Sequence, residues 1–141
     1  MALKATKADV WAVSIDDRSG SVADQLEAFA KAGANFEMVF ARRTPENPGH
    51  GMLFVTPVKG AKATRAATEA GMIRPPTIHS VRIEGADQPG LGAKITRALG
   101  DAGVSFRGIS AIAIGRKFVS YLACDTAEDQ ALAIATLKKL K

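Results

Sequence analysis

The sequence lacks the residues on which several common kinds of protein depend. A single cysteine, Cys124, excludes an internal disulfide framework, and two histidines, His50 and His79, are too few for a structural zinc site. No apolar run approaches the roughly 18 residues of a membrane span, and residues 1–7 carry no hydrophobic signal-peptide region. We therefore expect a cytoplasmic protein with no membrane partner, no metal and no cofactor.

Candidate catalytic groups are equally scarce. Cys124 falls in an apolar run, which predicts a buried thiol rather than a nucleophile. Asp16 and Asp17 are neighbours whose side chains point apart, so they indicate a turn and a helix cap rather than an acid–base pair. We expect no enzymatic activity.

The composition that remains is that of a small globular protein. Of the 141 residues 47% are hydrophobic, 6% are aromatic, and the net charge is +5. This charge divides as 10 − 8 = +2 over residues 1–75 and 9 − 6 = +3 over residues 76–141. Neither half concentrates it into the basic patch that binds nucleic acid.

The two halves of the chain repeat each other at an offset of 70 residues. Seven identities support the repeat, and in the first half they are Asp17, Gly20, Ala23, Ala28, Ala32, Gly33 and Phe36. Each half reads as strand, helix, strand, strand, helix, which predicts an α+β fold. Gly33 and Gly103 are placed to end the first helix of each half, and Thr126 to cap the last one, with Asp129 three residues on.

The fourth strand of each repeat is less well defined. In the first half, residues 72–74 can form a closing strand before the Pro75-Pro76 joint. In the second half the helix is followed directly by Lys141. The sequence leaves open what occupies that fourth position, for which residues 3–7 are a weak candidate.

One turn carries most of the functional information. Residues 87–92, Asp-Gln-Pro-Gly-Leu-Gly, lie between a predicted strand and a predicted helix. Proline and glycine make the turn tight, and its backbone N–H groups lie at the positive end of the helix, which favours an anion. Asp87 can accept hydrogen bonds from an ammonium group nearby. A free α-amino acid carries both groups.

The segment from Asp87 to Phe106 resembles the opening of an ACT domain, a small regulatory module that senses amino acids. The first half is similar over residues 10–72, although Ser19 stands where the second turn has Pro89. The resemblance implies a tandem of ferredoxin-like βαββαβ folds, with antiparallel sheets and the helices on one face. We expect an N-terminal stub at residues 1–9 and ACT-like domains at residues 10–74 and 77–141.

The resemblance also implies where a ligand binds, because ACT ligands meet the first turn of one module and the start of the second strand of its neighbour. The residues carried over for one site are Asp87, Pro89, Gly90, Leu91 and Gly92 with Asn35 and Phe36; those for the other are Asp17, Gly20 and Ser21 with Ser105 and Phe106. The sequence leaves open which turn faces which strand. The expected partners are a free amino acid, a second copy of the chain in a homodimer or larger homo-oligomer, and a separate effector protein.

Two alternatives remain beside the sensor hypothesis. The same order of elements builds the RNA-recognition motif, and residues 50–56 and 10–15 have a passing likeness to its two signatures. The repeat places Trp11 on the core side of its strand, so we expect it to be buried and nucleic acid not to be a partner. The other alternative is an interaction module without a ligand. A dinucleotide fingerprint is excluded, because its third glycine would fall at Ile95.

Overall fold

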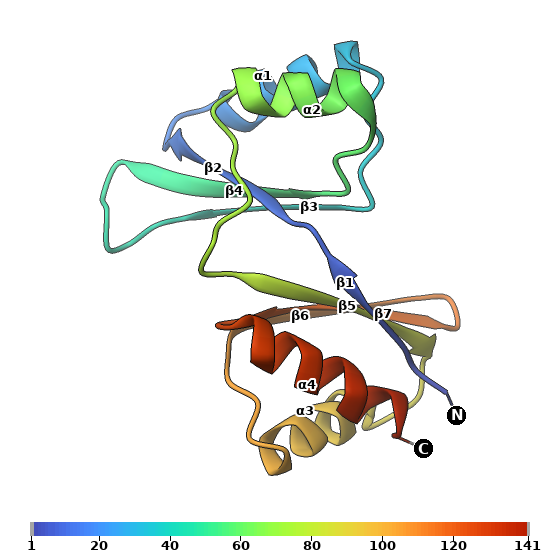
Figure 1. The fold of residues 1–141 in the computed structure, drawn as a ribbon. Helices are drawn as coiled ribbons and strands as arrows, with labels where there is room; N and C mark the ends of the chain where they lie inside the picture. The colour runs from blue at the N-terminus through green and yellow to red at the C-terminus, as the bar shows by residue number, and fades with distance from the viewer. Residues whose placement is uncertain (1, 141) are drawn as a thin grey trace. The chain divides into compact units, whose positions relative to one another are not determined.

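The computed structural model describes residues 2–140 and divides the chain into two compact units (Figure 1). Unit 1 consists of two stretches of the chain, the N-terminal residues up to Ala8 and the residues from Pro76 onward. Unit 2 spans Asp9–Pro75. Both units are α+β, with two helices packed on one antiparallel sheet, as the sequence predicts. None of the described helices is long and apolar enough to cross a membrane.

Unit 1 is a four-stranded antiparallel sheet in the order β1-β5-β7-β6. Its elements are β1 Lys4–Ala8, β5 His79–Ala86, α3 Leu91–Asp101, β6 Phe106–Ile114, β7 Lys117–Cys124 and α4 Ala127–Lys138. The side-chain oxygen of Thr126 accepts a hydrogen bond from the Asp129 N–H at 3.0 Å, so the predicted cap of α4 is confirmed.

The N-terminal strand fills the open fourth position of this sheet. β1 pairs antiparallel with β5, with Lys4 opposite Glu84 and Ala8 opposite Ser80. Leu3 and Ala5 are buried in the core of unit 1. A Cβ atom on Gly85 would lie 2.6 Å from Leu3 Cδ2, so the glycine leaves the space into which the leucine packs.

Unit 2 is a three-stranded antiparallel sheet in the order β2-β4-β3. Its elements are β2 Trp11–Asp16, α1 Ser21–Lys31, β3 Met38–Arg43, β4 His50–Thr56 and α2 Gly60–Glu69. The closing strand predicted at residues 72–74 is reduced to an isolated bridge between Ala12 and Ile73. Strand β3 begins at Met38, and the ring of Phe36, two residues before it, packs into the core.

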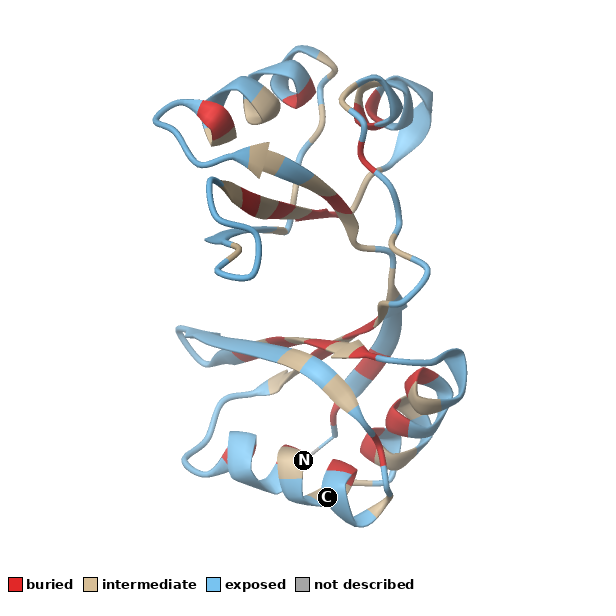
Figure 2. Ribbon diagram, turned by 90° about the vertical axis from the view of Figure 1, so that its left-hand side faces the viewer, coloured by how far each residue is buried: buried red, intermediate tan, exposed pale blue. Residues whose placement is uncertain are grey.

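Each unit has a hydrophobic core between its sheet and its helices. Buried residues alternate along β4 and β7 and recur on one side of each helix (Figure 2). The core cluster of unit 2 contains the buried residues Phe29, Leu53, Val55, Ala67 and Met72. Unit 1 buries a larger set, including Ile83, Leu91, Ile95, Leu99, Leu122 and Leu137. These cores fix the start of α1 and α3, and so the two turns that precede them.

Candidate ligand-binding turns

The two strand-to-helix turns are built in the same way, which extends the repeat to individual hydrogen bonds. The backbone N–H of Asp17 donates to the Gly49 carbonyl at 2.9 Å, and that of Asp87 donates to the Arg116 carbonyl at 2.8 Å. Gly20 and Gly90 precede α1 and α3 with φ of 90° and 82°. This left-handed conformation favours glycine, so each turn depends on it.

The second turn leaves its polar groups available. The Asp87 carboxylate has no hydrogen bond or ion pair with any other residue in the range 2–140. The N–H groups of Gly92 and Ala93, at the start of α3, likewise have no acceptor within that range. A carboxylate acceptor and a pair of donors at a helix N-terminus therefore lie on one exposed turn.

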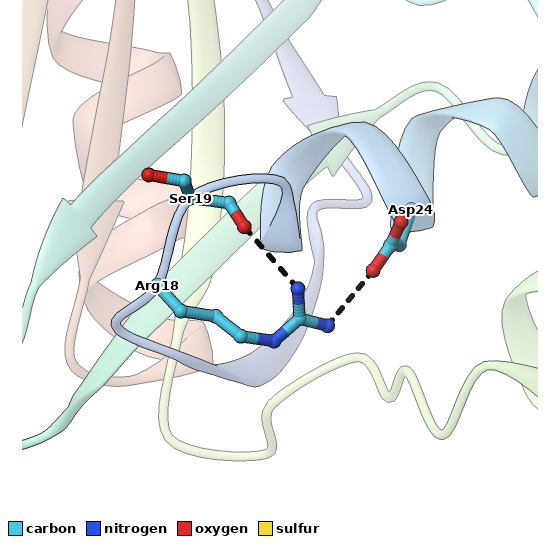
Figure 3. A network of polar contacts seen from close by, with 3 residues as sticks. All are labelled: Arg18, Ser19 and Asp24. Atoms are coloured by element: carbon cyan, nitrogen blue, oxygen red, sulfur yellow. Dashed lines mark hydrogen bonds and ion pairs between the residues drawn. The ribbon is translucent and has the colours of Figure 1, made fainter.

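The first turn is closed by its own side chains. Arg43 Nε donates to Asp17 Oδ2 at 2.9 Å. Arg18 folds beneath the start of α1, where it donates to the Ser19 carbonyl at 3.2 Å and to Asp24 Oδ2 at 2.8 Å (Figure 3). The hydrogen bond and the charge of Asp24 raise the pKa of Arg18 above its ordinary value. The Arg18 guanidinium group is thus held beside the start of α1 by these bonds.

Of two further positions within the turns, one differs between them and the other is alike. Gly92 has open space around its Cα, while the corresponding residue of the first turn, Val22, packs against the core of unit 2. Leu91 is buried, and its N–H donates to the Gln88 carbonyl at 3.2 Å. Leu91 therefore anchors the turn rather than offering a group to a ligand. Ser21, its counterpart, is also buried.

The residues predicted from the starts of the second strands fall into two kinds. Asn35 and Ser105 are exposed, with side chains available to a partner. Phe36 packs edge-on against Phe29 with ring centroids 5.0 Å apart, and Phe106 packs against the core of unit 1. Both side chains are partly buried and support the fold.

Arg18 and Arg43 are the residues that sequence reasoning missed. The sequence analysis assigns neither a role at the turn, whereas the two arginines form ion pairs with Asp24 and Asp17. For Arg18 a signal was present, since it precedes the helix and Asp24 lies in the first turn of that helix. Arg43 carried no such signal, because its partner is 26 residues away along the chain.

Trp11, strand β4 and Cys124 are the features that bear on nucleic-acid binding and catalysis. Trp11 lies on the core side of β2, where it is half-buried and the Arg74 guanidinium lies 5.6 Å from its ring centre. Residues 50–56, which have a likeness to an RNA-recognition signature, form β4, and the rings of Phe54 and Phe40 stack with their centroids 6.1 Å apart. Cys124 is buried, and this burial, aided by Asp129 and Asp125, raises the pKa of its thiol to about 11.

Comparison with known proteins identifies the second half of the chain. The family model of the ACT domain matches residues 79–141. None of the curated proteins compared matches the sequence.

Solved structures extend the similarity to the first half. A protein from Bacteroides thetaiotaomicron is 20% identical over 93% of this chain and 88% of that chain, with a TM-score of 0.76. The ligand-free regulatory subunit of aspartate kinase from Thermus thermophilus is 19% identical over 97% of each chain, with a TM-score of 0.64. Aspartate kinase from Clostridium acetobutylicum is 16% identical, with a TM-score of 0.60 over 99% of this chain and 34% of that chain.

These comparisons agree with the repeat that the sequence indicates. At such identities the solved structures establish the fold, while the family model identifies the domain. The predicted resemblance to tandem ACT-domain proteins is confirmed. Residues 79–141 match the family model of the ACT domain, and the first half of the chain repeats the same ferredoxin-like fold.

Proposed function

We propose that this protein is a non-catalytic regulatory sensor that binds a free α-amino acid at the turn between β5 and α3. The observation that carries the proposal is the open second turn, where the Asp87 carboxylate and the N–H groups of Gly92 and Ala93 have no partners between residues 2 and 140. The ligand carboxylate meets the N–H groups, and its ammonium group meets Asp87.

The ACT domain at residues 79–141 supports this choice of ligand, since the family is one of amino-acid sensors. A regulatory subunit of aspartate kinase has the same fold, which supports a regulatory role rather than a catalytic one. With Asp17 paired to Arg43, and Arg18 at the start of α1, the first turn offers fewer unmatched groups. The proposal therefore assigns one amino acid to each chain.

Signalling then follows from a shift between arrangements of modules. The ligand bridges Asp87–Gly92 to the start of a second strand in a neighbouring module, at Asn35 and Phe36 or, in another copy, at Ser105 and Phe106. The arrangement in which both sides contact the ligand becomes more populated as the ligand binds. A homo-oligomer supplies the neighbouring modules, and a separate effector protein reads the outcome.

The test is a thermal-shift screen of the full chain against the twenty amino acids. We expect at least one to raise the Tm, with the shift lost in Asp87→Asn and retained in the matched variant Asp17→Asn. Gly92→Val is a second blocking variant, because its backbone is unstrained and the new side chain enters open space. Gly90→Val is less useful, since φ is 82° at that position.

Two results would contradict the proposal. One is an absence of any shift across the panel, which would favour an interaction module without a ligand. The other is an equal loss of the shift in Asp87→Asn and Asp17→Asn, which would assign binding to both turns or to neither.

A further inference from the structure

Unit 1 has a hollow of about 460 Å³ that does not include the Asp87–Gly92 turn. Three segments meet there: the residues around the start of β1, the end of β5 and the hairpin between β6 and β7. Its charged lining residues are Lys4, Glu84, Arg116 and Lys117. Three of these four side chains are basic, so the hollow is suited to an anion.

Strand pairing brings three of these side chains, those of Lys4, Glu84 and Lys117, to one face of the sheet. Lys4 stands opposite Glu84, and Lys117 stands opposite Ala86. Directly opposed residues on antiparallel strands share a face, and Glu84 and Ala86 are two positions apart on β5. The remaining lining of β5 is Gly85 and Ala86, which carry no side chain larger than a methyl group. The basic side chains therefore border open space.

The single carboxylate in the hollow, that of Glu84, already forms ion pairs with basic side chains. Glu84 Oε1 lies 3.3 Å from Arg82 Nη2 and 3.3 Å from Lys117 Nζ. Arg82 first, and Lys117 second, hold the pKa of Glu84 below its ordinary value. Lys4 and Arg116, by contrast, have no acidic partner in the described part of the chain. Two positive charges thus remain unmatched.

We propose that this hollow binds the phosphate group of a small phosphorylated molecule. A phosphate monoester carries about −1.5 to −2 charges at neutral pH, which matches the two unpaired cations. Arginine binds phosphate through two parallel N–H groups, and lysine adds a point charge. The hollow is open to solvent, so the rest of the ligand can extend out of it. A hydroxyl or amine of that remainder can donate to Glu84.

The hollow is also connected to the proposed amino-acid site. The Arg116 carbonyl accepts the hydrogen bond from the Asp87 N–H at 2.8 Å, so one hairpin residue lines the hollow and holds the turn. The phosphate site does not require that an amino acid bind. Its test uses other ligands, so either proposal can fail while the other stands.

The experiment is calorimetric titration of the full chain with glycerol 3-phosphate and with inorganic phosphate, at constant low ionic strength because exposed charges are screened by salt. We expect both to bind, and Arg116→Gln and Lys4→Gln each to weaken binding by about tenfold or more. Both side chains are exposed. The Asp87 hydrogen bond uses the backbone of Arg116, so the variants are expected to fold.

Arg107→Gln is the matched control, because Arg107 is an exposed arginine of the same unit whose Nε lies 3.6 Å from Asp125 Oδ1. It should bind like the wild type. Succinate serves as the carboxylate dianion and should bind at least about tenfold more weakly. Absence of phosphate binding, equal affinity in all variants, or equally tight succinate binding would each overturn the proposal.

Discussion

At the scale of single residues, Ser120 is the least expected member of the core. It is fully buried in β7, and its hydroxyl has no hydrogen-bond partner among residues 2–140. A buried hydroxyl without a partner costs about 1–3 kcal/mol. We therefore expect Ser120→Ala to increase the free energy of unfolding by about 1 kcal/mol in urea titrations.

Ser110→Ala is the control for this substitution, since Ser110 lies exposed on the neighbouring strand β6. It should change the stability by less than about 0.5 kcal/mol. A loss of stability in Ser120→Ala would mean that the hydroxyl is hydrogen-bonded in solution.

Cys124 gives a prediction about pH. Its pKa of about 11 in the folded protein, raised first by burial, exceeds the value of about 8.5 expected for an unfolded thiol. As the pH rises, the unfolded chain therefore loses the thiol proton before the folded protein does. The contribution of the thiol to the free energy of unfolding is fully present below about pH 8.5 and is lost as the pH rises towards 11. We expect unfolding titrations to detect this loss, and Cys124→Ala to reduce it.

The same burial should protect the thiol from reagents. At pH 8 the native protein is expected to react with dithiobisnitrobenzoate far more slowly than the protein in denaturant. Rapid and complete labelling of the native state would contradict the burial of Cys124.

At the scale of elements, β1 and the residue before it contribute to the stability of unit 1. Leu3 and Ala5 are buried with residues of β5 and α4, far away in the sequence. Leu3→Ala should lower the free energy of unfolding of unit 1 by about 2–3 kcal/mol, through lost burial and the cavity left behind. The exposed Lys7→Ala is the control. Urea unfolding followed by Cys124 labelling measures the effect, and equal midpoints for the two variants would show that β1 is dispensable.

The elements that the sequence predicted well are those specified by local signals. Gly33, Gly103 and the Thr126 cap mark helix ends within a few residues, and the structure has each of them in its expected role. The role of β1 was only weakly indicated, because its partner β5 lies more than 70 residues away. Five residues with one buried face resemble a disordered terminus until their partner strand is known.

The two turns show the same contrast between local signals, which the sequence reveals, and contacts between distant residues, which it does not. Their backbone geometry follows from Gly20 and Gly90, so sequence alone located both. Which turn is open depends on side chains, since Arg43 reaches Asp17 from another strand. Such a contact leaves no trace in local spacing, so the sequence distinguished the two turns only by Ser19 in place of Pro89.

At the scale of the whole molecule, the two units differ in how much apolar surface supports them. Among the described residues, the core of unit 1 contains thirteen buried residues and that of unit 2 five. Helix α2 buries only two alanines, Ala63 and Ala67. Stability rises with the apolar area removed from water, and small domains bury less of it. Unit 2 should therefore be the less stable unit.

The chain provides one native probe for each unit, which makes this difference measurable. Trp11, the single tryptophan, lies in unit 2, and Cys124, the single cysteine, lies in unit 1. We expect the urea midpoint from tryptophan emission to fall below the midpoint from thiol labelling. Val55→Ala should lower the first by an amount equivalent to about 2 kcal/mol and leave the second unchanged. Coincident midpoints that move together in this variant would instead show that the two units unfold as one cooperative body.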